Sequence, residues 1–222
     1  MSDRLFFPAI LKALIIVSLF TFVNLPSTTS AQSKIKYTKP PQPRNAWSVG
    51  LNYGENGFGP FASYFVPVGK TTDLTFNLSF SGVTDAREIE RYDIFGNSVT
   101  IDKINRVFMM PFSIGIRKEL FKEEIEGGFI PVINLGISPT LVLTNPYDKS
   151  FFKAIPFTQS HFAAGAYGGL GVNFTQSDNI SMNISLNYYY LPIIGDGVQS
   201  LQNNTITNVG GMQLAFGVNF LR

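Results

Sequence analysis

The sequence predicts an all-β fold in which eight antiparallel strands run up and down and close into a barrel. Three observations support this prediction. Apolar and polar residues alternate with period two over much of residues 46–222, the predicted strands are long, and short and long connections alternate along the chain. A strand sends successive side chains to opposite faces, so this alternation produces a sheet with one apolar and one polar face.

The alternation is clearest near the C-terminus. From Ile180 to Tyr190 the even positions are Ile, Met, Leu or Tyr, whereas Asn and Ser fill most of the odd positions. The same pattern predicts strands at residues 46–53, 58–68, 74–80, 106–118, 128–143, 161–174, 179–190 and 212–220. Strand 58–68 alternates least, because both of its faces are apolar.

Strand length and composition indicate which solvent surrounds the barrel. Globular strands usually run about 5–6 residues, whereas tilted membrane-spanning strands need about 9–11. Only 14% of the residues are charged, compared with about 25% in typical globular proteins. The polar face holds Ser, Asn, Thr, Gly and Ala instead of the Lys, Glu and Arg usual on a water-facing surface. We therefore expect the polar face to line a lumen and the apolar face to meet lipid, as a transmembrane β-barrel requires.

Two further features agree with a membrane-spanning barrel. Lipid cannot satisfy unpaired backbone groups, so a spanning sheet must close on itself. Aromatic residues near the predicted strand ends are typical of the girdles at membrane interfaces; they are Trp47, Tyr53, Phe129, Phe174, Tyr188, Tyr190 and Phe220. A soluble secreted β-barrel that binds a lipid is the alternative.

The N-terminal region predicts export. Arg4 and Lys12 accompany a polar start, residues 13–25 are mostly apolar, and small residues precede a predicted cleavage site after Ala31. This order is typical of a signal peptide. A single membrane-spanning helix is the alternative, because a span needs about 20 apolar residues, but Pro8 and several polar residues interrupt the run.

The segment between the predicted signal peptide and the barrel is rich in proline and basic residues. Residues 32–45 contain three prolines, three lysines and one arginine, a composition that predicts an extended periplasmic linker. A basic arm that contacts an anionic surface is the alternative. The predicted organisation is a signal peptide at 1–31, the linker at 32–45 and the barrel at 46–222.

The connections between predicted strands alternate in length. Short connections lie at residues 69–72, 121–127 and 175–179, and long ones at 84–104, 144–160 and 193–209. The connection at 54–57 is an exception, because it is short although it should lie at the same end of the barrel as the long loops. Short periplasmic turns and long external loops are the expected asymmetry of an outer-membrane barrel.

Together, the predicted export signal, eight alternating strands, alternating connections and aromatic final strand resemble the small eight-stranded outer-membrane β-barrels. Outer membrane protein X and the barrel domain of outer membrane protein A belong to that family. The resemblance covers residues 46–222 and implies a location in the outer membrane of a Gram-negative bacterium. It also implies delivery by periplasmic chaperones and insertion by the barrel-assembly machinery, which reads a C-terminal signal that matches Phe216, Val218 and Phe220. Leu221 and Arg222 extend beyond the family's usual terminal aromatic residue.

Little in the sequence points to catalysis. There is no cysteine and only one histidine, His161, which excludes disulfides, thiolate sites and histidine clusters. Ser160 and His161 could serve a hydrolase, but adjacent strand residues point to opposite faces. The acidic and basic loop at 84–103 predicts solvated ion pairs, with a divalent-cation or lipopolysaccharide contact as the alternative. We expect no enzyme activity, catalytic residue, metal or cofactor.

The predicted lumen is the candidate functional site. Its candidate residues are Asn77, Arg117, Asn134, Tyr167, Asn173, Asn183, Asn187 and Asn219. The leading hypothesis is a non-enzymatic envelope component that presents long extracellular loops, and the alternative is a narrow channel or transporter for small or hydrophobic solutes. The expected partners are outer-membrane lipid and lipopolysaccharide. A net charge of +2 argues against nucleic acid, and we expect a monomer.

Overall fold

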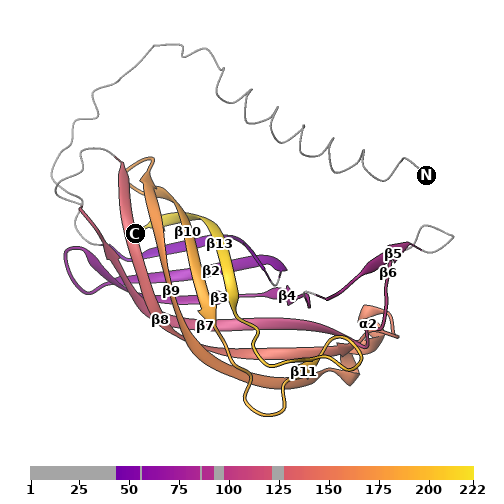
Figure 1. The fold of residues 1–222 in the computed structure, drawn as a ribbon. Helices are drawn as coiled ribbons and strands as arrows, with labels where there is room; N and C mark the ends of the chain where they lie inside the picture. The colour runs from indigo at the N-terminus through magenta and orange to yellow at the C-terminus, as the bar shows by residue number, and fades with distance from the viewer. Residues whose placement is uncertain (1–43, 56, 86, 93–97, 122–127) are drawn as a thin grey trace, which may run out of the picture. The chain divides into compact units, whose positions relative to one another are not determined.

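The computed structural model describes residues 44–55, 57–85, 87–92, 98–121 and 128–222. Eight antiparallel wall strands close into a barrel, as predicted (Figure 1). They are β1 (Ala46–Gly54), β2 (Gly57–Pro67), β3 (Thr72–Ser79) with its continuation β4 (Ser81–Val83), β7 (Asn105–Glu119), β8 (Phe129–Pro146), β9 (Gln159–Thr175), β10 (Ile180–Tyr190) and β13 (Gly211–Leu221). The signal peptide at 1–31, residues 32–43 of the linker and the turn at 122–127 lie outside the described residues, so these remain predictions.

Pairing between the first and last strands closes the barrel. Trp47 of β1 lies opposite Phe220 of β13 on one side and Tyr64 of β2 on the other. This closure leaves no open sheet edge in the wall, which is what lipid demands of a spanning sheet.

Strands β3 and β4 are one wall strand with a single interruption. Leu78 lies opposite Phe112 and Ser81 opposite Met109, so the register on β7 continues across the break at Phe80. By this register, the break faces the stretch of β7 that contains Pro111, which has no N–H to donate to a ladder. The wall therefore extends beyond the predicted strand 74–80, as far as Val83.

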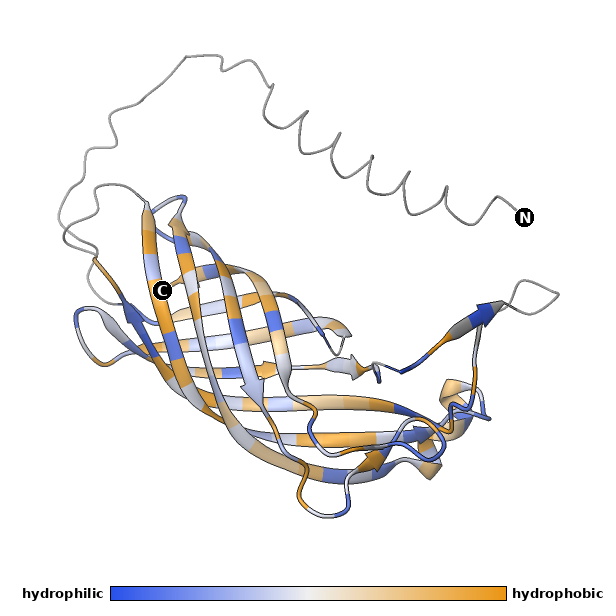
Figure 2. Cartoon of the chain, in the orientation of Figure 1, coloured by the Kyte–Doolittle hydropathy of each residue, from blue (hydrophilic) through white to orange (hydrophobic). Residues whose placement is uncertain are grey.

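Burial follows the predicted alternation around the wall. On β13, Gln213, Ala215, Gly217 and Asn219 are buried, whereas the side chains between them face outward. Figure 2 shows the result as alternating bands of hydropathy along the strands. Large apolar side chains exposed on the outside include Val49, Leu51, Leu78, Phe112, Ile116, Ile133, Leu135, Ile137, Leu170, Ile184, Leu186 and Phe216.

The two ends of the barrel differ. At one end, called here the short-turn end, the turns at 68–71 and 176–179 lie beside the start of β1 and the end of β13. The opposite end is the long-loop end. Its connections carry structure of their own: β5 (Glu90–Tyr92), β6 (Ser98–Thr100), α2 (Phe151–Ala154), the 3-10 turn η1 (Ile155–Phe157), β11 (Val198–Gln199) and β12 (Thr205–Ile206).

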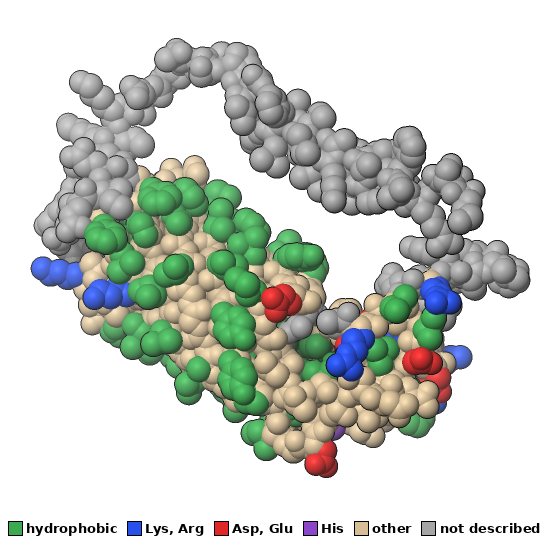
Figure 3. Space-filling model, in the orientation of Figure 1, with side chains coloured by type: hydrophobic (Ala, Val, Ile, Leu, Met, Phe, Trp, Pro, Cys, Tyr) green, Lys and Arg blue, Asp and Glu red, His purple; other side chains and the backbone are tan. Residues whose placement is uncertain are grey.

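The outside of the barrel is apolar over much of its height. Figure 3 shows hydrophobic side chains spread over the wall, with Lys and Arg side chains at the left and right ends of the barrel in that view. Within the described part of the chain, no helix is long and apolar enough to cross a membrane.

Candidate functional site in the barrel lumen

A polar cavity of about 70 Å³ lies in the lumen. It draws on every wall strand. Seven of the eight candidate residues named from the sequence line it: Asn77, Arg117, Asn134, Tyr167, Asn173, Asn183 and Asn187. The eighth, Asn219, is buried beside the cavity lining and is not part of it.

Asparagine and serine side chains form a hydrogen-bonded layer around this cavity. Asn183 donates from Nδ2 to Asn219 Oδ1 at 2.7 Å, and Asn219 donates onward to Ser181 Oγ at 2.9 Å. On the other side of the barrel, Asn77 donates to Ser63 Oγ at 2.7 Å. Short polar side chains suit a narrow barrel because each can reach a partner on a neighbouring strand without blocking the centre.

Two buried amide oxygens in this cavity have no hydrogen-bond partner among the residues that the structure describes. They are Oδ1 of Asn52 and Oδ1 of Asn173, and both residues line the cavity. Buried polar groups of this kind are normally satisfied by water or a polar ligand. The cavity is therefore chemically suited to water or a small polar solute.

The charged group in the cavity lining is held by a partner that the sequence analysis missed. Arg117 donates from Nη2 to Asp73 Oδ2 at 2.6 Å and from Nε to the same oxygen at 3.1 Å. Its guanidinium also lies 3.8 Å from the ring centre of Phe65. Arg117, the charged residue among the predicted lumen candidates, is thus half of an ion pair. Asp73 could have been found from the alternation of faces along the strand, because it lies on the same face of β3 as Thr75 and Asn77.

Aromatic side chains fill the lumen more than the small polar face of the sequence suggested. Tyr167 lies in register with Gly136 and Gly115 on successive strands, and its hydroxyl lies 3.4 Å from Thr75 Oγ1 on the strand beyond. A Cβ added at Gly136 would clash with the Tyr167 ring, and one added at Gly115 would clash with the Tyr167 hydroxyl oxygen. The ring of Phe61 likewise lies over Gly50 and Gly217, which are in register with it on the next two strands. Bulky rings therefore cross the lumen where neighbouring strands carry glycine.

The long-loop half of the lumen is closed by an apolar cluster, called here the plug. Residues 191–210 fold inward, and Leu191 and Val209 are almost fully buried against wall residues. The plug and its wall contacts comprise Val83, Val107, Met109, Val142, Ala163, Tyr167, Tyr189, Leu191, Ile193, Val198 and Val209. Tyr167 and Tyr189 stack with ring centres 5.1 Å apart. Because both tyrosines also line the polar cavity, this stack is the boundary between the polar and apolar halves.

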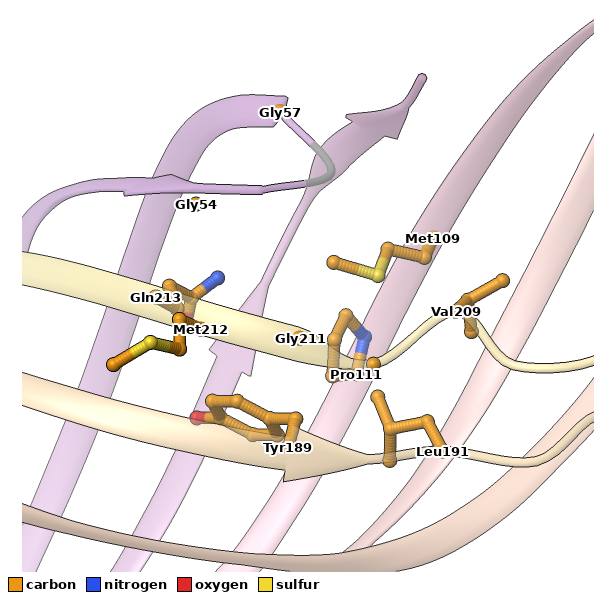
Figure 4. A pocket seen from close by; sticks show the side chains of 11 residues that line it. Gly54, Gly57, Met109, Pro111, Tyr189, Leu191, Val209, Gly211, Met212 and Gln213 are labelled. Atoms are coloured by element: carbon orange, nitrogen blue, oxygen red, sulfur yellow. The ribbon is translucent and has the colours of Figure 1, made fainter. Parts of the chain in front are cut away.

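A second, much smaller pocket of about 10 Å³ lies beside the plug. Figure 4 shows Leu191 and Val209 facing Met109 and Pro111 across it, next to the β1–β2 hairpin at Gly54 and Gly57. Its lining is mostly apolar, with Met109, Pro111, Leu191, Val209 and Met212 among the contributing side chains.

Ionic and polar contacts fasten the plug to the neighbouring loop. Glu88 accepts from Lys103 Nζ at 2.5 Å and from Ser200 Oγ at 2.7 Å. The backbone N–H groups of Ile104 and Asn105 both donate to the carbonyl of Ser200, at 2.8 and 3.2 Å. These four contacts form what we call the loop clamp. Three of them join Ser200 of the plug to the neighbouring loop, and the fourth, between Lys103 and Glu88, lies within that loop.

The remaining sequence predictions fall outside the lumen or do not come together. Phe216 and Phe220 are half-exposed on the outer face of β13, on the same side as Val218. Ser160 and His161 point to opposite faces of β9, so they do not form a pair. Among the described residues, no group of three or more His, Asp or Glu side chains could hold a metal ion.

The comparisons with known proteins rest on structure alone. No family model matches the chain, and no curated relative matches its sequence. Neisserial surface protein A matches with a TM-score of 0.53 at 11% identity, over 80% of this chain and 95% of that protein. A major outer membrane protein from Thermus thermophilus matches with a TM-score of 0.51 at 14% identity, over 79% and 98% of the two chains.

A third match is the N-terminal β-barrel domain of OprF from Pseudomonas aeruginosa. Its TM-score is 0.49 at 12% identity, over 80% of this chain and 96% of that domain. The proteins behind the first two matches share with this chain a closed barrel of antiparallel strands. The chain therefore has the fold of the small eight-stranded outer-membrane β-barrels.

Proposed function

We propose that this protein is a plugged, non-enzymatic barrel of the bacterial outer membrane that carries its folded long-loop end on the cell surface. The observation that carries the proposal is the plug: Leu191, Val142 and Val209 are buried across the long-loop half of the lumen. A lumen closed by packed apolar side chains is a rigid support and not an open pore.

The outer surface supports the membrane placement. Exposed Leu, Ile and Val side chains occupy the middle of the wall, and aromatic residues lie toward both ends. Toward the short-turn end they are Trp47, Phe129, Phe174 and Phe220, and toward the long-loop end Tyr53, Phe58, Phe162, Tyr188 and Tyr190. An apolar band between two aromatic girdles is the pattern of a barrel surrounded by lipid.

Loop lengths support the orientation. In outer-membrane barrels short turns face the periplasm and long loops face outward, so the start of β1 and the linker before it belong to the periplasm. This orientation requires export through the predicted signal peptide at 1–31. The outer face of the final strand, with Phe216, Val218 and Phe220, would then serve the barrel-assembly machinery, with periplasmic chaperones delivering the chain. Outer-membrane lipid and lipopolysaccharide would surround a monomer.

The experiment that tests this proposal is conductance of residues 32–222 refolded into a planar bilayer. We expect no discrete current steps from protein whose gel mobility changes on boiling, the sign of a folded barrel. A variant in which residues 191–210 are replaced by a short Gly-Ser link is the matched control, and it should conduct because this segment of the plug, with Leu191 and Val209, is gone. Steps from the unaltered protein would refute the plugged barrel.

One observation favours a second candidate function, a narrow channel for small polar solutes. A polar cavity lies in the lumen, and Asn52 and Asn173 present to it amide oxygens that have no hydrogen-bond partner among the described residues. Conduction would require the plug to move. Current steps from the unaltered protein that change when Arg117 or Asn134 is replaced would support this candidate.

A further inference from the structure

We propose that residues 147–158, which contain α2 and η1, form an interfacial anchor that lies on the outer leaflet of the membrane. In this arrangement Phe152, Ile155 and Phe157 insert among lipid chains, while Lys149 and Lys153 meet the phosphates of anionic lipid headgroups. The inference rests on the proposed membrane placement and goes beyond it, because it assigns a lipid contact to a loop.

The anchor is attached firmly to the rim of the barrel. Arg106 donates from Nη1 to the carbonyls of Pro146 at 2.9 Å and Lys149 at 3.1 Å, and its guanidinium lies 4.6 Å from the ring centre of Tyr147. Ala154 in the middle of the segment is fully buried. These contacts hold the segment in one orientation, so the faces it presents are set by the barrel.

Three large apolar side chains of the segment are mostly exposed. Phe152 is 81% exposed, and Ile155 and Phe157 are each more than half exposed. A loop in water would leave these apolar side chains uncovered, whereas a short amphipathic segment at a membrane buries such side chains at the boundary between headgroups and acyl chains.

A continuous series of aromatic rings connects the anchor to the outer wall. Phe80 stacks on Phe108 with ring centres 5.7 Å apart, and Phe108 meets Phe151 edge-on at 5.9 Å. Phe151 in turn meets Phe152 at 5.5 Å. Since Phe80 and Phe108 lie on the outer face of the wall, the apolar surface of the anchor continues the proposed lipid-facing belt.

The charges of the segment match an anionic headgroup layer. Lys153 follows the exposed Phe152 in α2, and Lys149 Nζ lies 4.8 Å from the ring centre of Phe157. The Oδ2 atom of Asp148 lies 3.4 Å from Lys149 Nζ, and the Asp148 side chain is largely exposed. Long lysine side chains can cover apolar surface while their ammonium groups reach the phosphates.

Tryptophan fluorescence in vesicles tests the inference directly. The chain has a single tryptophan, so Trp47→Phe supplies a background without tryptophan. Into this background we would place Phe152→Trp, Leu186→Trp on the outer wall, or Gln202→Trp on the exposed part of the 191–210 loop. Each refolded variant is measured in phosphatidylcholine vesicles with phosphatidylglycerol, with bromine on the upper or lower part of the acyl chains, after heat-modifiable mobility confirms folding.

The three positions should respond differently. Leu186→Trp should be quenched most by deep bromines, Phe152→Trp by shallow bromines with blue-shifted emission, and Gln202→Trp by neither. If Leu186→Trp escapes quenching, the proposed membrane placement fails. If Leu186→Trp is quenched and Phe152→Trp behaves like Gln202→Trp, the barrel is in the membrane and only the anchor is refuted.

A second comparison tests the headgroup contact. In the Phe152→Trp protein, adding phosphatidylglycerol to phosphatidylcholine vesicles should increase shallow quenching about twofold, because basic residues near an anionic surface strengthen the association. The double change Lys149→Gln and Lys153→Gln should abolish this increase. The matched control is Lys70→Gln with Lys118→Gln, which removes the same charge at the short-turn end and should leave the increase intact. An increase that survives in both double variants would overturn the lysine contact.

Discussion

The ring of Tyr167 lies across the backbone of Gly136, its direct partner on the neighbouring strand. The same ring continues over Gly115 and brings its hydroxyl to Thr75, so one side chain bridges four wall strands. Because neither glycine has a side chain, the aromatic ring takes the volume that two Cβ atoms would need. This fit between a large ring and two glycines explains why glycine and tyrosine residues occur together on the lumen face, where side chains fill the interior of the barrel.

Truncation of this ring should be costly. Tyr167→Ala removes the bridge and the stack on Tyr189, and we expect a loss of about 3–5 kcal/mol in the free energy of unfolding, typical of a large side chain deleted from a packed interior. Urea unfolding followed by the heat-dependent gel shift measures it. Tyr188→Ala, next to the stack but on the outer face, should cost clearly less. Equal losses at the two positions would contradict the packing described here.

The ion pair in the cavity predicts a strong asymmetry between single and double variants. Arg117→Met leaves the carboxylate of Asp73 largely buried and without its cation, and removal of one partner of a buried pair typically costs about 3–5 kcal/mol. Combining Arg117→Met with Asp73→Asn should recover much of that loss in the same unfolding assay. Lys118→Ala on the outer face should change stability by no more than about 0.5 kcal/mol. Strictly additive losses in the double variant would show that the pair is not coupled.

The two faces of β10 should respond oppositely to a polarity change. Leu186 faces outward and Asn187 is buried in the lumen, where it donates to Ser185 Oγ at 3.1 Å. Leu186→Arg should cost roughly 2–4 kcal/mol if this position lies near the bilayer midplane. Refolding yield and urea unfolding in phosphatidylcholine vesicles measure the effect. A harmless Leu186→Arg together with a severe Asn187→Leu would mean that the lipid face and the lumen face are reversed.

The loop clamp predicts local loosening without global unfolding. Glu88→Ala removes the acceptor of Lys103 and Ser200, and hydrogen bonds to charged groups contribute about 1.5–3 kcal/mol each. The amides of Ile104 and Asn105, which donate to Ser200, should then exchange hydrogen about tenfold faster or more. Asp148→Ala removes an exposed ion pair instead and should leave this exchange unchanged. Unaltered exchange in Glu88→Ala would show that Glu88 does not help to hold the plug in place.

The sequence by itself determined the wall of the barrel. Strand positions, the two faces and the alternation of turns all follow from a period of two along the chain, and a period is a local property that needs no knowledge of neighbouring strands. The alternation of odd and even positions was enough to place Asn183 and Arg117 on the lumen face. Even the weakly alternating predicted strand 58–68 agrees with β2 to within one residue at both ends.

Only the tertiary structure decided how the lumen is filled. Whether Tyr167 can cross the barrel depends on Gly136 and Gly115 lying beside it on other strands, and the partner of Arg117 is an aspartate 44 residues away in the chain. The plug is decided in the same way, since Leu191 and Val209 come from a predicted loop and become buried only because long wall strands surround them. Register between strands and the volume inside a closed barrel are properties of the whole assembly of strands, so no local pattern encodes them.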